Sequence, residues 1–450
     1  MFTGINPYNK EVIYQIPADA PNTVENKLAN AHRCYKILKT FTYAQKAQCL
    51  LQLADYFTKN KIALATEITV QMGKAITEAY IEVEKCIKTC QWYAEQGAPM
   101  MQEKLVQTEA RLAKYTYEAS GVLFAIMPWN FPLWQAMRFI IPQILAGNAI
   151  ILKHAPNVLL SGQSLLLAMQ HTNLPTGFLQ LALIETIDCE KYIADKRITG
   201  VTLTGSVQAG QSVAMLAGKY IKKSVLELGG SDPFIVLPDA DIDKAAAMAV
   251  KARFQNAGQT CIAAKRWIVL KPVVHVFIEA CLALIKNIRM GNPILATTTM
   301  GPLARVDIAK NLAHQLNNSL ANGATKIYGG QYNYCQFEPT LISTNNANIM
   351  AMQQETFGPL AVVHAVENTE ALIALANQTN YGLGASIWTN NELHALDLAK
   401  QIEAGNIYIN QMVKSHAALP FGGIKQSGYG HELSKHGIQE FMNIKSIWVA

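Results

Sequence analysis

The chain has 450 residues, of which 50% are hydrophobic and 16% charged, and its formal net charge is +6. This length predicts two or three domains with sizeable cores, and the small, dispersed positive charge argues against a nucleic-acid partner. No apolar run reaches about 18 residues, so no membrane span is expected. The N-terminal residues lack a basic and then apolar leader, and eight cysteines show no disulfide framework spacing. We therefore expect a cytoplasmic protein with free thiols.

The first hundred residues are predicted to be mostly helical, after a short turn-and-strand lead-in at 6–13. Apolar residues recur at helical spacing between residues 23 and 95. Cys86 and Cys90 lie four residues apart on one helix face, with no His or acidic ligand set beside them. Core packing is the better interpretation than a metal site, and no metal is expected.

Residues 104–118 change character, because apolar and polar residues alternate at a period of two. This pattern predicts a polar-faced strand pair that projects from the body and serves as an oligomerisation arm. The apolar tail at 443–449 is predicted to be a strand suited to pairing with another subunit.

Strands and helices alternate from residue 121 onward. The predicted strands are short apolar runs, as expected for parallel sheets covered by helices on both faces. They lie at 121–126, 149–153, 178–184 and 200–204, and, in a second unit that begins near residue 231, at 233–237, 266–270, 361–363, 385–389 and 406–410. Helices are expected between them, the first at 132–146.

The sequence thus predicts an α/β fold with two doubly wound, Rossmann-like domains and a small β oligomerisation arm. We assign residues 1–103 and 119–227 to a cofactor-binding domain and residues 228–416 to a catalytic domain. The arm and tail are assigned to 104–118 and 431–450.

Small and polar residues follow the predicted strands, at the ends where doubly wound sheets bind ligands. Gly205, Ser206 and Gly210 open a helix directly after a strand, where a phosphate can approach free backbone N–H groups. Such a turn is weak evidence alone, because many glycine-rich turns bind nothing. Lys153 ends another strand and either reaches a ribose or phosphate or is simply solvated.

Cys261 follows Gly258-Gln-Thr, between a predicted helix and a strand. A lone cysteine is more often an inert core residue, and becomes a candidate nucleophile only with suitable partners. Glu227 lies among leucines before a Gly-Gly pair, where desolvation would raise its pKa toward that of a general base; a surface glutamate is the alternative. Asn130 supplies an amide that could form an oxyanion hole with the backbone N–H of Cys261.

Together these segments resemble the NAD(P)-dependent aldehyde dehydrogenase superfamily over essentially the whole chain. The segments that carry the resemblance are, in order, Pro128-Trp-Asn-Phe-Pro132, Lys153, Gly205-Ser206, Leu226-Glu-Leu-Gly-Gly230, Gly258-Gln-Thr-Cys261, Glu355-Thr-Phe-Gly-Pro359 and Pro420-Phe-Gly-Gly-Ile-Lys-Gln-Ser-Gly428.

The resemblance implies a role for each catalytic candidate. Cys261 would attack the aldehyde carbon, Asn130 would hold the oxyanion, and Glu227 would activate water to hydrolyse the thioester. The cofactor-binding set it implies is Trp129, Lys153, Pro156, Gly205, Ser206, Gly210, Leu228, Glu355 and Phe357, with Lys153 and Glu355 on the two riboses. It also implies a homodimer or homotetramer built by the arm and the tail.

The run Lys153-His-Ala-Pro156 lacks the glutamate that often binds the adenosine ribose in this family. Without that carboxylate a 2′-phosphate is not repelled, so NADP is allowed beside NAD, and both are left open. The only cations available there are Lys153 and His154.

Arg138 is similar to the arginine that succinate-semialdehyde dehydrogenases place at this spacing for the distal carboxylate of the substrate. A guanidinium suits a carboxylate by bidentate bonding; a salt bridge on the helix surface is the alternative. Gln255 and His416 are expected beside it.

The predicted function is oxidation of a small aldehyde, first of all succinate semialdehyde, with NAD(P)⁺. The alternatives are an aldehyde dehydrogenase for neutral aliphatic aldehydes, a CoA-acylating one, and a non-catalytic structural protein on the same scaffold. Retention of Glu227 argues against the last two.

Overall fold

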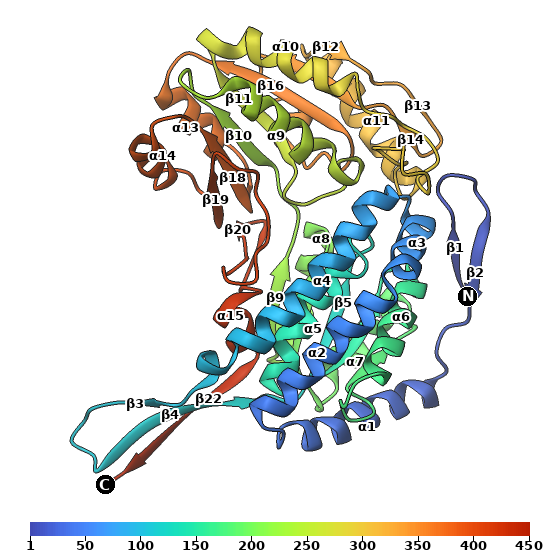
Figure 1. Cartoon of the computed structure of the whole chain (residues 1–450), viewed down its shortest axis with the longest axis vertical. Coiled ribbons are helices and arrows are strands. Elements are labelled where there is room, and N and C mark those ends of the chain that lie inside the picture. Colours follow the sequence, from blue (N-terminus) through green and yellow to red (C-terminus); the bar gives the residue numbers. More distant parts are fainter.

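The computed structural model describes residues 1–450 as two α/β lobes and a projecting arm. Figure 1 shows the lobes stacked along the long axis, with the arm leaving the lower lobe and carrying the C-terminus at its tip. The N-terminal hairpin of β1 (Phe2–Ile5) and β2 (Val12–Ile16) runs along the side of the lower lobe toward the upper one.

The first lobe is built on a six-stranded sheet with the order β21-β9-β8-β5-β6-β7. All neighbours run parallel except β21, which pairs antiparallel with β9. The strands are β5 (Val122–Met127), β6 (Ala149–His154), β7 (Leu179–Leu181), β8 (Ile198–Thr204), β9 (Lys223–Glu227) and β21 (Gly428–Tyr429).

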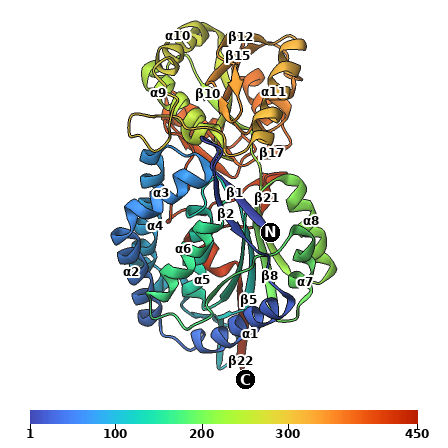
Figure 2. The same cartoon turned by 90° about the vertical axis from the view of Figure 1, so that its right-hand side faces the viewer.

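Helices cover both faces of this sheet, as Figure 2 shows. Leu123 and Ala125 of β5 join a core with α2 to α6, whereas Val122 and Phe124 join a core with α1, α7 and α8. This alternation explains the unbroken apolar run of β5, since both of its faces are buried. The helices are α1 (Pro21–Leu38), α2 (Tyr43–Lys59), α3 (Lys61–Met72), α4 (Ile76–Gln96), α5 (Trp134–Ala146), α6 (Leu159–Gln170), α7 (Cys189–Ala194), α8 (Val207–Lys219) and α15 (Ser434–Gln439).

The second lobe contains a seven-stranded sheet with the order β12-β15-β16-β11-β10-β18-β19. Only β12 is antiparallel to its neighbour. The strands are β10 (Asp232–Val236), β11 (Ala264–Leu270), β12 (Thr325–Tyr328), β15 (Thr340–Thr344), β16 (Leu360–Val366), β18 (Gly384–Trp388) and β19 (Asn406–Ile409). The helices are α9 (Ile242–Phe254), α10 (Val274–Ile285), α11 (Val306–Ala321), α12 (Met350–Gln353), α13 (Thr369–Asn377) and α14 (Glu392–Ala399). Short two-stranded pairs join β13 (Tyr332–Asn333) to β14 (Gln336–Phe337) and β17 (Tyr381–Gly382) to β20 (Ile424–Lys425).

The arm is a three-stranded antiparallel sheet of β3 (Lys104–Leu105), β4 (Leu112–Ala119) and β22 (Met442–Val449). The tail pairs with the arm of its own chain, from Met442 opposite Ala119 to Val449 opposite Leu112. In this sheet β22 is an edge strand, so the backbone groups on its other side are unpaired, and pairing with another subunit stays a prediction.

The predicted α/β fold is confirmed, with differences at the ends of elements and in segments that carried no clear pattern. The helix expected from residue 132 begins at Trp134, because the Glu82 carboxylate accepts hydrogen bonds from the backbone N–H groups of Leu133 and Trp134, each at 2.9 Å. The strands β12 and β15 and the helices α13 and α15 were not predicted. No helix has both the length and the apolar character needed to cross a membrane.

Candidate active site

The four predicted strand-end residues of the first lobe lie along one edge of its sheet. Strands β9, β8, β5 and β6 are consecutive and parallel, so their carboxyl ends meet at the same edge. Glu227 ends β9, Gly205 follows β8, Asn130 follows β5 and Lys153 lies at the end of β6. Parallel pairing thus aligns residues that are scattered along the sequence.

Cys261 lies on a tight turn between α9 and β11, in the second lobe. Three consecutive residues before it adopt left-handed backbone angles, with φ of 55° at Asn256, 52° at Ala257 and 72° at Gly258. The Asn256 side chain donates to the backbone oxygen of Asn130 at 2.8 Å, and the Asn130 amide donates to the backbone oxygen of Gln259 at 2.9 Å. These bonds fix an otherwise unfavourable turn against the end of β5.

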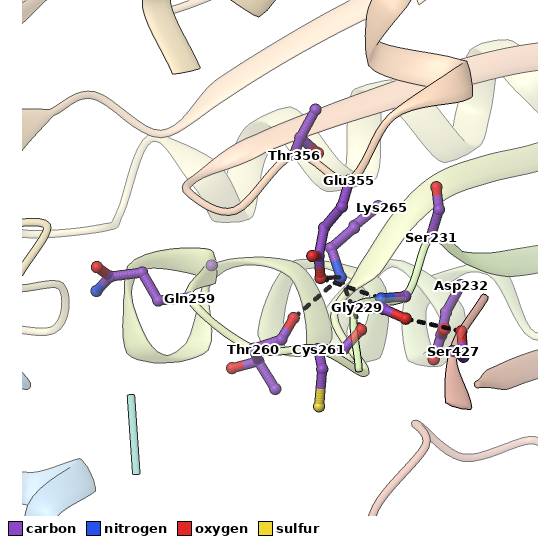
Figure 3. A network of polar contacts seen from close by, with 12 residues as sticks. Gly229, Ser231, Asp232, Gln259, Thr260, Cys261, Lys265, Glu355, Thr356 and Ser427 are labelled. Atoms are coloured by element: carbon purple, nitrogen blue, oxygen red, sulfur yellow. Dashed lines mark hydrogen bonds and ion pairs between the residues drawn. The ribbon is translucent and has the colours of Figure 1, made fainter. Parts of the chain in front are cut away.

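Lys265 holds the backbone side of the Cys261 turn. Its buried ammonium donates to the backbone oxygens of Thr260, at 3.0 Å, and Cys261, at 2.7 Å, and lies 3.3 Å from the Glu355 carboxylate. Figure 3 shows that the Cys261 thiol points away from this ammonium. Lys265 therefore shapes the turn and leaves the sulfur free on the opposite side.

Arg253, which is fully buried, joins the same turn to the loop that carries Glu355 and Phe357. Its guanidinium donates to the backbone oxygens of Leu360 at 2.7 Å, Thr356 at 3.0 Å and Gly258 at 3.3 Å. These bonds use its donors within the protein, so Arg253 is structural.

The carboxyl group of Glu227 lies in a buried charged cluster near the Cys261 thiol. Arg138 approaches Glu227 at 3.6 Å and also pairs closely with Glu432; all three side chains are at most 3% exposed. The Glu227 oxygens have no hydrogen-bond partner. An unsatisfied buried carboxyl is costly in a purely structural site and suits a base that binds a water or substrate atom.

The charges around Cys261 set its resting state. Burial, with a smaller contribution from the carboxyl groups of Glu227 and Glu355, raises the pKa of the Cys261 thiol to about 12 against the opposing cations of Arg138 and Lys265. Burial also raises the pKa of Glu227 well above its usual range, opposed by Arg138. A protonated thiol beside a carboxyl group of raised pKa gives a nucleophile that needs a base and a base able to take its proton.

A cavity of about 450 Å³ opens on Cys261. Arg138 and Gln255 line it, as the sequence predicted, together with Lys85, Trp134 and the turn residues. His416 does not line it: its ring is exposed, and Nδ1 accepts a hydrogen bond from the backbone N–H of Ala418 at 3.2 Å. The neighbouring residue Ser415 lies in the cavity wall instead.

The residues expected to hold a dinucleotide fit such a ligand. Ser206 caps the N-terminus of α8 by accepting from Ala209 N at 3.3 Å, and no acidic residue lies in the first turn of this helix. Lys153 is buried and forms no ion pair with an acidic residue. Gly210 packs against Leu228 so closely that a Cβ would clash, which keeps α8 on the sheet edge. The helix start and the unpaired lysine leave cationic and N–H groups for phosphate and ribose.

The aromatic pair predicted for the cofactor cleft is also assembled. Trp129 and Phe357 come from different lobes and meet edge to face, with ring centroids 5.6 Å apart. Glu355 lies beside them and accepts a hydrogen bond from the backbone N–H of Gly230 at 3.1 Å. Pro156 is exposed after β6. His154 is fully buried, bonds through Nε2 to the Pro132 oxygen at 2.7 Å, and so is withdrawn from any phosphate.

Three residues near the thiol were missed from the sequence: Lys85, Lys265 and Glu432. Lys265 had a weak signal, because a lysine inside an apolar strand start is unusual. Glu432 lies close to Arg138 only because the C-terminal segment returns to the first lobe, where Gly428 pairs with Glu227. No local pattern reports such a contact.

The chain matches the model of the aldehyde dehydrogenase family over residues 1–447. A probable NADP(+)-dependent succinate-semialdehyde dehydrogenase from Synechocystis sp. is 42% identical over 451 aligned positions, covering 99% of both proteins. The succinate semialdehyde dehydrogenase Sad of Escherichia coli, named as NAD(P)+-dependent, is 38% identical over 99% of this chain and 97% of its own length.

Solved structures agree with these relatives. The crystal structure of succinic semialdehyde dehydrogenase from Streptococcus pyogenes, in complex with NADP+, matches with a TM-score of 0.97 at 35% identity and covers 100% of both chains. The chain therefore belongs to the aldehyde dehydrogenase family, as its motifs predicted.

Proposed function

We propose that this protein oxidises succinate semialdehyde to succinate with NADP⁺, and that Cys261 forms the covalent intermediate. The observation that carries the proposal is that Cys261 opens on a cavity rich in cations, while Arg138 in the cavity wall lies 3.6 Å from Glu227 and Asn130 bonds to the turn that carries Cys261. The names of the relatives from Synechocystis sp., Escherichia coli and Streptococcus pyogenes support the same substrate.

The residues divide the chemistry as follows. Glu227 takes the thiol proton, and the Cys261 thiolate adds to the aldehyde carbon to give a thiohemiacetal. The Asn130 amide has a second N–H beyond the one bonded to Gln259, and with the Cys261 backbone N–H it stabilises the developing oxyanion. When bound, a nicotinamide cofactor would accept the hydride that leaves the thiohemiacetal carbon as the Cys261 thioester forms. Once Glu227 has released the thiol proton to solvent, it deprotonates a water that hydrolyses the thioester, which releases succinate and restores the Cys261 thiol.

For the cofactor we propose NADP, with NAD as a slower alternative. The end of β6 bears Lys153 and no acidic residue up to Pro156, so a 2′-phosphate meets a cation and no carboxylate. With His154 bonded inside the protein, Lys153 is the cation we assign to that phosphate.

A kinetic panel tests the proposal. Succinate semialdehyde, butanal and a longer neutral aldehyde are compared with NAD and NADP in parallel, with and without coenzyme A. We expect the highest kcat/KM for succinate semialdehyde with NADP, no need for coenzyme A, and loss of turnover in Cys261→Ala. Equal kcat/KM for butanal, or a strict requirement for coenzyme A, would contradict it. Mass spectrometry of the wild-type enzyme, denatured during turnover, should show an acyl group on Cys261.

A further inference from the structure

The cavity beside Cys261 is lined by five cations, and they differ in how their charges are compensated. They are Lys74, Lys85, Arg138, Lys251 and Lys414. Lys74 pairs with Glu82 inside the protein, and Arg138 pairs with Glu432 and Glu227. Lys251 and Lys414 are exposed and solvated. Lys85 alone is half-buried without any carboxylate partner.

The surroundings of Lys85 hold its ammonium in place without neutralising it. Nζ donates to the Ser415 hydroxyl at 2.6 Å and lies 4.3 Å from the ring centroid of Trp134. An ammonium carries more N–H donors than this single bond uses. A cation–π contact and one neutral acceptor orient the group but leave its charge for a ligand.

The electrostatics agree with this geometry. Burial and, less strongly, the positive charge of Arg138 lower the pKa of Lys85 to about 8, while Cys86, Glu82 and Cys261 oppose the shift. The protein places no carboxylate of its own against this ammonium. A ligand carboxylate would therefore stabilise the charged form of Lys85.

We propose that Lys85 is the residue that receives the distal carboxylate of the substrate, and that it makes the cavity selective for aldehydes with a terminal acid. The proposal rests on the function proposed above. It gives Arg138, whose guanidinium is held between two carboxyl groups, the separate task of positioning Glu227. Lys85 belongs to α4 of the first lobe, whereas Cys261 belongs to the second lobe. The spacing between the two lobes therefore determines which length of aldehyde reaches both residues.

The test compares kcat/KM for succinate semialdehyde with kcat/KM for butanal, because the ratio cancels effects on groups that serve both aldehydes. In Lys85→Met we expect this ratio to fall about tenfold or more, mainly through KM for the acid, as for a lost charged hydrogen bond. Lys85→Arg should restore part of the ratio. Lys88→Met, on the same helix but exposed, is the matched control and should leave it unchanged.

The wild-type protein offers a second readout that needs no variant. Lys85 must be protonated to attract a carboxylate, so the ratio should fall as the pH rises above about 8. A ratio that stays flat from about pH 7 to about pH 9.5, or that survives in Lys85→Met, overturns the inference.

Two further outcomes separate the inference from the proposed function. A wild-type ratio near one defeats the proposed function itself, and the inference with it. A ratio that collapses in Arg138→Gln but not in Lys85→Met keeps the proposed function and moves the carboxylate to Arg138, against the inference.

Discussion

The two sides of Cys261 are built in opposite ways. On its backbone side, Lys265 and Arg253 are bonded to main-chain oxygens, and the turn is fixed. On its thiol side, Glu227 has no hydrogen-bond partner, and Lys85 has one neutral partner. The polar groups of the backbone side hold the turn in its conformation. Those of the thiol side remain available to bind substrate and water. Residue type alone does not distinguish the two sides, because both contain buried cations and acids.

Of the variants considered, removal of the proposed base Glu227 on the thiol side should have the largest effect on kcat. Glu227→Gln keeps the shape of the side chain but cannot accept a proton, and we expect kcat to fall by about 10²- to 10⁴-fold. Measured turnover with succinate semialdehyde checks this; the control is Glu440→Gln, at a half-buried position directly after α15 where Glu440 pairs with Lys223. A loss of less than about threefold would exclude Glu227 as the base.

The neighbouring acid Glu432 gives a second test of the role of Glu227, through the pH dependence of kcat. Burial, opposed by Arg138, and the negative charge of Glu432 raise the pKa of Glu227, and the base acts when deprotonated, so kcat should rise with pH on the acidic limb. Glu432→Gln removes that charge and leaves Arg138 to Glu227 alone. Both effects lower the pKa of Glu227, so the acidic limb should move to lower pH. A shift to higher pH in the pH–kcat profile would contradict the cluster.

Loosening the backbone side should cost less. Lys265→Met removes the donor to the Thr260 and Cys261 oxygens, and we expect about a tenfold fall in kcat with both acid and neutral aldehydes. The control is Lys271→Met, at the exposed end of the same strand region. An effect confined to the acid aldehyde would show that Lys265 acts on substrate charge, not on the turn.

The smallest effect concerns stability. Glu78, in the cavity wall, accepts from Asn256 N at 3.0 Å, and burial raises its pKa to about 7. Between its usual value and about 7 the folded state binds more protons than the unfolded state, so this residue makes stability fall as pH rises through that window. Glu78→Gln should remove the loss, on the order of 1 kcal/mol after solvent screening. Tm of the variant relative to wild type should therefore increase from pH 5 to pH 7.5; a constant difference would refute it.

The sequence predicted the fold and the reacting groups for one physical reason. Glu227, Asn130 and Lys153 each follow or end an apolar strand, and parallel sheets bring such positions to one edge, while Cys261 lies just before the apolar strand β11. The sequence did not predict which buried cations are paired with carboxyl groups, because those pairs join distant segments. Arg138 was assigned to substrate because nothing in its own helix indicates that Glu432 lies against it, and that assignment stays a prediction.

Lys85 is the opposite case to Arg138, because nothing in the sequence assigned it to the substrate. It lies on a helix rich in charged residues and therefore reads as a solvated lysine. Only the return of the chain at Ser415 and the placement of Trp134 show that its ammonium faces a cavity. Tertiary contacts between distant segments decide which of many lysines is available to a ligand, and periodicity contains no information about them.

The closing of the C-terminal segment over the first lobe has a consequence for biosynthesis. Phe421 packs on Arg138, and Glu432 forms an ion pair with Arg138. The last strand, β22, pairs with β4. These contacts join early and late parts of the chain and form slowly, while N-terminal regions fold first during translation. The charged cluster around Glu227 is thus completed only when the C-terminal segment has reached the first lobe.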